Sequence, residues 1–173
     1  YDVNILPDQS RTSHLRVRYD YFDSLAKNDP AIDPENHGPR DYKTLTQIYL
    51  PNDANILEEN GLKQSSINDL EDYTLVVTRV DVDYDTSERI ELSYETPAVE
   101  DRLGNFYRYR LLIQKQLGSQ IEDVNLQIRL PQNAQIIRLS PDADAGYELE
   151  QPILDYQLQL VSDQWIEVIY SLD

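Results

Sequence analysis

The chain has 173 residues, of which 32 are acidic and 15 are basic, so its net charge is −17 at pH 7. This charge repels phosphate backbones and anionic lipid headgroups, and it therefore disfavours binding to nucleic acid or to a membrane surface. The absence of cysteine excludes disulfides, thiolate metal sites and cysteine nucleophiles. No apolar run approaches the ~20 residues of a membrane-spanning helix, so we expect no membrane insertion within this segment.

Apolar and polar residues alternate along most of the chain, which is typical of half-buried β-strands. In the first such segment, residues 15–21, the odd positions are apolar or aromatic and the even positions are charged. Other alternating segments follow at residues 76–82, 90–94, 124–130, 154–160 and 166–172. The pattern predicts an all-β protein with roughly ten strands. One short helical turn is predicted at residues 66–70, where Ser66 is a suitable N-cap.

Two parts of the chain resemble each other in sequence and in the order of their segments. Residues 48–57 match residues 128–137, both containing Leu-Pro, and residues 91–94 match residues 167–170 further along. Such a repeat indicates related structural units. We therefore expect two tandem antiparallel β-sandwich modules of the Ig-like type, at residues 1–98 and 99–173. Thirteen tyrosines must supply much of their cores, at positions where each hydroxyl finds a partner.

The first module contains a long segment, residues 24–41, that is rich in proline and charge. The second copy has only the short turn at residues 117–120 in its place. A long loop present in one copy alone is either a functional elaboration or a tolerated surface insertion. The boundary between the modules is expected within residues 96–105.

Several of these segments carry a resemblance to a known family. The most distinctive is the run Tyr-Arg-Leu-Leu-Ile-Gln-Lys-Gln-Leu-Gly at residues 109–118, and the others are residues 42–51, 90–97 and 129–131. Over roughly residues 10–170 the chain resembles the C-terminal β region of a bacterial domain-of-unknown-function family, numbered 4012. The resemblance implies an exported envelope protein with this region outside the cytoplasm, at the cell surface or in the envelope, anchored through a segment outside this chain. The family has no assigned activity, so no catalytic residue is implied.

The residues themselves offer little for catalysis. The only histidines are His14 and His37, and the chain has neither a Gly-x-Ser-x-Gly elbow nor a glycine-rich phosphate loop. Carboxylates are so numerous that a pair of them carries no information about glycoside hydrolysis. We therefore expect no enzyme activity.

Calcium is the metal that the acidic residues would favour, because it prefers hard oxygen ligands. Asp142 and Asp144, followed by Gly146, resemble the opening of a calcium loop, although a third acidic residue and a closing glutamate are missing. Acidic clusters at residues 81–88 and 29–41 are weaker candidates. For each cluster the alternative is an ordinary solvated surface, and we expect no other cofactor.

Trp165 is the candidate interaction residue, since the alternation directs it away from Ile166. An outward tryptophan is a sugar platform or an interface anchor, and Tyr147 or Tyr107 would extend such a surface for carbohydrate. Alternatively, Trp165 packs between the modules or against another part of the parent protein. Equivalent strands also carry outward arginines, which are Arg16, Arg18, Arg108 and Arg110. These arginines form either a binding stripe or cross-strand ion pairs with the acidic residues Asp20, Glu91 and Glu95.

The sequence thus predicts a non-enzymatic, extracytoplasmic spacer, assembly or adhesion element of a bacterial cell-envelope protein. Its expected partner is another protein or the remainder of the parent protein. The alternative is a ligand-binding module, for carbohydrate or for calcium-dependent adhesion.

Overall fold

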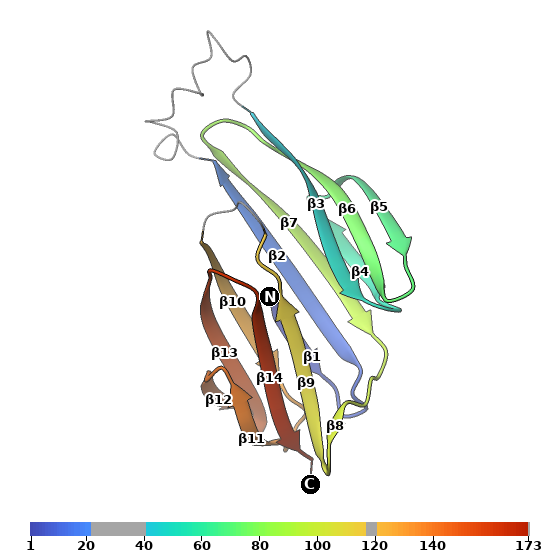
Figure 1. The fold of residues 1–173 in the computed structure, drawn as a ribbon, viewed down its shortest axis with the longest axis vertical. Coiled ribbons are helices and arrows are strands. Elements are labelled where there is room, and N and C mark those ends of the chain that lie inside the picture. The colour runs from blue at the N-terminus through green and yellow to red at the C-terminus, as the bar shows by residue number, and fades with distance from the viewer. Residues whose placement is uncertain (22–40, 117–120, 173) are drawn as a thin grey trace. The chain divides into compact units, whose positions relative to one another are not determined.

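The computed structural model describes residues 1–21, 41–116 and 121–172, which form fourteen β-strands in three sheets (Figure 1). These residues contain no helix, so the all-β prediction is confirmed. The expected number of strands, roughly ten, was too low. Short or largely exposed strands account for the difference, because they offer too little of the alternation that marks a strand in sequence. The predicted long loop, residues 24–41, falls outside the described residues except for Asp41.

The described chain divides into two compact units, one made of residues 1–14 and 97–173 (unit 1) and one of residues 15–96 (unit 2). The predicted modules, 1–98 and 99–173, differ from these units at the N-terminus. Residues 1–14 were predicted in the first module, but they belong to the same unit as residues 97–173. Strand β1 (Asp2–Ile5) pairs in parallel with β10 (Glu122–Arg129), with Val3 opposite Ile128. A parallel pairing between such distant segments leaves no local pattern, so the sequence did not indicate it.

Unit 1 is built from two sheets. One runs in the order β12-β13-β10-β1 and ends on the first residues of β2 (Arg11–Tyr21); the other runs β11-β14-β9-β8. The remaining bounds are β8 (Arg102–Leu103), β9 (Phe106–Ile113), β11 (Gln135–Ser140), β12 (Asp144–Glu148), β13 (Gln151–Leu160) and β14 (Gln164–Ser171). Alternate residues of both sheets form one core, which includes Val3, Ile5, Tyr109, Leu126, Ile128, Leu130, Leu154, Tyr156, Ile166, Val168 and Tyr170.

Unit 2 has two three-stranded layers, β2-β7-β4 and β3-β6-β5. Its strands are the rest of β2, then β3 (Tyr42–Pro51), β4 (Asn55–Asn60), β5 (Lys63–Asp69), β6 (Tyr73–Val82) and β7 (Thr86–Thr96). The buried residues alternate along β6 and β7, as the period of two predicts. They include Ile48, Leu50, Val76, Val80, Val82, Ile90, Leu92 and Tyr94.

The two units use their strands in the same order. In unit 2 the sixth strand, β7, lies between β2 and β4, and in unit 1 the corresponding β14 lies between β9 and β11. The other layers also match, as β3-β6-β5 and β10-β13-β12. Local irregularities recur at matching positions. Asp53 and Asn133 have φ of 59° and 62°, and register shifts follow at Ile56/Glu58 and Ile136/Arg138.

The predicted helical turn at residues 66–70 is wrong. Strand β5 continues to Asp69 and pairs with β6, with Ile67 opposite Val76. Asp69 also accepts a hydrogen bond of 3.1 Å from the hydroxyl of Thr74. A five-residue helical turn makes few hydrogen bonds of its own, so pairing with β6 overrides the capping preference of Ser66.

Candidate functional site

The candidate site lies on the outer face of β9 and β14 in unit 1. These strands pair with Trp165 opposite Leu112 and Glu167 opposite Arg110. Ile166 and Val168 of β14 are completely buried. Because successive side chains of a strand point to opposite faces, Trp165 and Glu167 point away from the core. Trp165 is 56% exposed, which agrees with its predicted outward direction. We call this surface the β9–β14 outer face and define it as Arg108, Arg110, Leu112, Trp165 and Glu167.

Asp101 organises the arginines of this face. Arg108 donates to it through Nε, at 3.1 Å to both carboxylate oxygens, and through Nη2 at 2.7 Å to Oδ1. The Nε of Arg110 lies 3.3 Å from Oδ2, and the backbone N–H of Arg108 donates to the Asp101 carbonyl. The hydrogen bonds from Arg108 hold the pKa of Asp101 below its ordinary value, and the same contact raises the pKa of Arg108.

The predicted partners of the arginines were only partly right. Arg18 does pair with Asp20, at 2.7 Å, but the two residues lie on the same strand, β2, and not across the sheet as expected. Arg108 and Arg110 were expected to pair across the sheet with acids such as Glu91, but they pair with Asp101 instead, and Glu91 pairs with Arg89. Asp101 lies just before the short strand β8, in a segment without strand structure, so the alternation of strand residues could not predict that its carboxylate contacts β9. The sequence signal that would have found it is its position just before the β8–β9 hairpin.

Trp165 is held beside a cation. The guanidinium carbon of Arg110 lies 6.0 Å from the centroid of the indole ring, at the outer limit of a cation–π contact. Arg138 of β11 pairs with Glu167 at 2.7 Å. The face thus combines an exposed aromatic ring with guanidinium groups positioned by carboxylates. Such a combination suits contact with a protein surface or with planar polar groups, since tryptophan and arginine are the side chains most enriched at interfaces.

The other candidate interaction residue, Tyr147, lies on a different sheet of unit 1. It is 70% exposed on the edge strand β12, opposite Pro152. Tyr107 points to the inner side of β9, where its ring stacks on Tyr170 with centroids 5.6 Å apart. A single aromatic surface formed by Trp165 with Tyr147 or Tyr107 is therefore not present in the structure.

Asp142 and Asp144 are both exposed at the start of β12. Asp144 pairs in register with Asp155, and the charge of Asp142 contributes to the raised pKa of Tyr156, although burial of the phenol is the larger cause. Within residues 1–21, 41–116 and 121–172, no group of three or more His, Cys, Asp or Glu side chains is arranged to hold a metal ion. Calcium binding at Asp142 and Asp144 stays a prediction from sequence.

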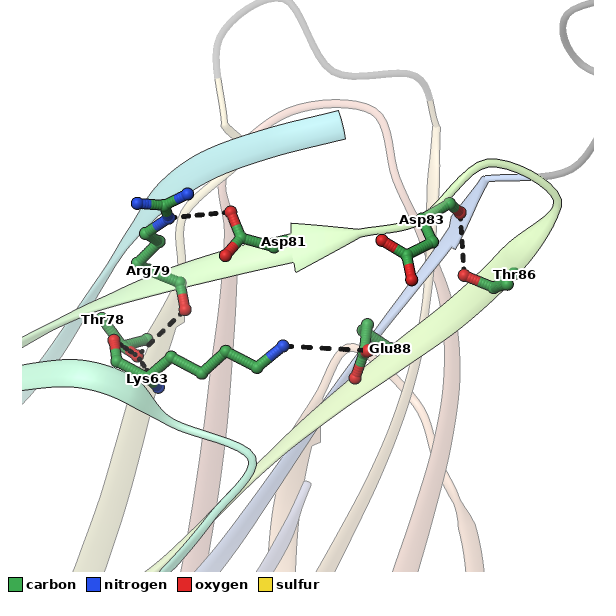
Figure 2. A network of polar contacts seen from close by, with 7 residues as sticks. All are labelled: Lys63, Thr78, Arg79, Asp81, Asp83, Thr86 and Glu88. Carbon is green, nitrogen blue, oxygen red and sulfur yellow. Dashed lines mark hydrogen bonds and ion pairs between the residues drawn. The ribbon is translucent and has the colours of Figure 1, made fainter. Parts of the chain in front are cut away.

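The second acidic cluster, residues 81–88, lies in the β6–β7 hairpin of unit 2, where neighbouring side chains engage it (Figure 2). Asp81 accepts a hydrogen bond of 2.7 Å from Arg79, and Glu88 lies 3.9 Å from the ammonium of Lys63. The carbonyl of Asp83 accepts from the hydroxyl of Thr86 at 2.8 Å. These contacts fit a stabilised hairpin, and the third cluster, residues 29–41, lies outside the described residues except for Asp41.

A scan against models of protein families finds no match to this chain, and a search of curated proteins finds no match either. Among the residues with a described structure, none belongs to a helix long and apolar enough to cross a membrane.

We expect Asp101→Asn to lower the free energy of unfolding by ~1–2 kcal/mol at pH 7, because charged hydrogen bonds to two arginines are lost. The pKa of Asp101 is lowered on folding, so its stabilisation is present above the unfolded-state pKa of ~3.9 and disappears as pH falls through the folded-state pKa. Urea titrations of both proteins at pH 7 and at progressively lower pH measure the difference. The exposed Asp123→Asn variant controls for the change in net charge, and an Asp101→Asn effect independent of pH would contradict this explanation.

Proposed function

We propose that the chain is a non-enzymatic contact module. In this proposal it is an extracytoplasmic spacer, assembly or adhesion element of a bacterial cell-envelope protein, built from two copies of one Ig-like sandwich. Its partner is another protein or the remainder of its parent protein. The envelope location rests on the family resemblance carried by residues 109–118 and their neighbours.

The common strand order of the two units supports the proposed duplication. The sequence repeat falls on corresponding strands, β3 with β10 and β7 with β14. Left-handed residues and β-bulges at matching positions add support, since bulges are retained within families of related sheets. Each copy of a repeated sandwich has its own core, so repetition lengthens the chain while every copy stays folded, which suits a spacer.

The observation that carries the contact role is the β9–β14 outer face. Its tryptophan is more than half exposed on a regular strand, and its arginines are held in place by Asp101. A contact residue on a paired strand loses little conformational entropy on binding, because its backbone is already ordered.

A ligand-binding module is the second candidate. The exposed ring of Trp165 beside Arg110 also suits a sugar, and Asp142 with Asp144 would provide the calcium dependence of an adhesion module. The separation of Trp165 and Tyr147 on different sheets of unit 1 favours the first candidate, because it leaves one aromatic ring where a sugar platform commonly uses several.

The contact role is tested by retention of a bacterial cell-envelope fraction on beads that carry the purified chain. We expect retention that falls at least ~30-fold with Trp165→Ala, the loss of a ~2 kcal/mol interface residue. Leu149→Ala removes another highly exposed apolar side chain away from this face and should change nothing. Retention that soluble sugars abolish, or that EDTA abolishes and calcium restores, selects the ligand-binding alternative. No retention, or retention unaffected by Trp165→Ala, overturns the proposed surface.

A further inference from the structure

Strand β3 of unit 2 is an unusual edge. Six strands end a sheet in the described structure, and an unpaired edge is a template for another strand. Five of the six carry a recognised protection. The register of β4, β5 and β11 is broken by a bulge, β8 has only two residues, and β12 carries Asp144 and Glu148. Strand β3 carries Lys43 and Pro51 near its two ends, which also oppose pairing, but it has ten residues, no acidic residue and an unbroken register with β6, and residues 44–50 carry no charge.

The corresponding edge of unit 1 is occupied. Strand β10 matches β3 in the repeat, and β1 pairs along its edge in parallel, opposite residues 127–129. Val3 and Ile5 of β1 are almost fully buried there. The fold therefore accepts an added strand at this position, whereas no described strand pairs with the matching edge of β3.

The outer side chains of the two strands also differ. Where β10 carries Asn125, Gln127 and Arg129, the matching positions of β3 are Leu45, Gln47 and Tyr49. Leu45 is 71% exposed and Tyr49 is 52% exposed. The outer face of β3 thus carries two large apolar side chains where that of β10 carries Asn125 and Arg129, and both have a glutamine between them.

The same contrast extends to the neighbouring strand. The outer residues in the first half of β6 are Tyr73, Leu75 and Val77, while the register-matched residues of β13 are Gln151, Ile153 and Asp155. Further along the same face of β6, Arg79 and Asp81 form an ion pair. The rings of Tyr49 and Tyr73 contact each other edge to face, with centroids 5.1 Å apart. Since about one residue in five of the chain is acidic, an apolar patch that is made of Leu45, Tyr49, Tyr73, Leu75 and Val77 and lies beside an open edge is typical of an interface.

We propose that β3 is a self-association edge, along which a second copy of this chain adds its own β3 in antiparallel orientation, centred on Gln47. This register places Leu45 of each copy opposite Tyr49 of the other, so that apolar cross-strand pairs form on both sides of the centre. Lys43, the only charged residue of β3, falls opposite Pro51, so no like charges meet. The symmetric arrangement makes one patch complementary to itself, as a two-fold dimer requires.

Association along β3 is not needed to bury the core of unit 2, because Ile48 and Leu50 of β3 are already buried in the single chain. Thr46, also on the inner side of β3, has its hydroxyl 2.6 Å from the hydroxyl of Tyr19, so the inner face of the strand is satisfied while its edge stays unpaired. An added β3 supplies backbone hydrogen bonds and the Leu45–Tyr49 contacts, which indicates a reversible dimer. Because each copy carries −17, repulsion opposes association, and salt that screens it should strengthen the dimer.

This inference rests on the proposed assembly role and names the partner for it. The test is sedimentation velocity of the purified chain over a range of protein and salt concentrations. We expect a monomer–dimer equilibrium that shifts toward dimer as salt rises. Gln47→Glu and Gln47→Lys each place like charges face to face at the two-fold axis and should weaken the dimer at least tenfold. An equimolar mixture of the two variants should restore association as a heterodimer, which a damaged fold would not do.

Asn125→Glu is the matched control, since it adds a charge at the outer face of the occupied edge, and it should leave the equilibrium unchanged. A chain that stays monomeric up to ~1 mM, where association is worth only ~4 kcal/mol, overturns the proposal. A dimer that is indifferent to both Gln47 variants also overturns it. The bead assay with Trp165→Ala is independent of this edge, so failure of the dimer and failure of the contact role are distinguishable.

Discussion

Between about pH 10 and pH 12, the free energy of unfolding is expected to fall by on the order of 5 kcal/mol because of buried tyrosines. Burial raises the pKa of Tyr156 and of Tyr170 to about 12, and it raises the pKa of Tyr109 further. In the unfolded chain these phenols titrate near pH ~10. Above that pH the unfolded state releases protons that the folded state retains, so stability decreases with pH until the folded-state pKa is reached.

The measurement combines far-ultraviolet circular dichroism with phenolate absorbance as pH is raised. The exposed tyrosines, such as Tyr49 and Tyr147, should ionise without loss of structure, and a second group should ionise together with the unfolding transition. A smooth ionisation of all tyrosines with the β-sheet signal intact would contradict the expected linkage.

Two phenylalanine variants sharpen this test, because their hydroxyls have different surroundings. The hydroxyl of Tyr170 donates a buried hydrogen bond of 2.5 Å to the side-chain oxygen of Gln9, so Tyr170→Phe should cost ~1–3 kcal/mol at pH 7 by leaving that oxygen unpaired. The hydroxyl of Tyr156 is buried with no hydrogen-bond partner in the described structure. Tyr156→Phe should therefore be neutral or stabilising at pH 7, and it should also reduce the loss above pH 10.

The sequence located strands well where one face is buried and the other is wet. The alternation in β6 and β7 predicts which residues are buried. In β14 it predicts the outward position of Trp165 and the buried residues except Ile169, which is buried at an outward position. It fails on β5, whose seven residues are all exposed. The strand state of β5 comes from pairing with β6, which is a tertiary interaction that local propensity does not encode.

The candidate site was predicted in its residue types more than in its arrangement. Arg108, Arg110 and Trp165 were expected to point outward because strand period alone determines it. Their partner Asp101 was missed, since an irregular segment brings it to β9. The tyrosine cores were also only partly anticipated, because buried phenols were expected to find partners, and Tyr156 does not.

Gly61→Ala is expected to lower the free energy of unfolding by ~2–5 kcal/mol, combining the left-handed backbone penalty with overpacking. Gly61 connects β4 to β5 with φ of +74°, and a Cβ atom there would lie 2.1 Å from the backbone oxygen of Arg89. A backbone atom of a paired strand cannot rotate away as a side chain can. The chain must therefore shift at the start of β5 or strain β7.

Two other glycines separate the causes of this loss. Gly104 has φ of +63° and nothing within 4 Å of an added Cβ, so Gly104→Ala tests the backbone penalty alone and should cost ~1 kcal/mol. Gly146 has ordinary φ and equally open space, so Gly146→Ala should be neutral or slightly stabilising. Urea unfolding of the three variants should rank them in this order. If Gly61→Ala and Gly104→Ala cost the same, the approach of Arg89 is not what requires glycine between β4 and β5.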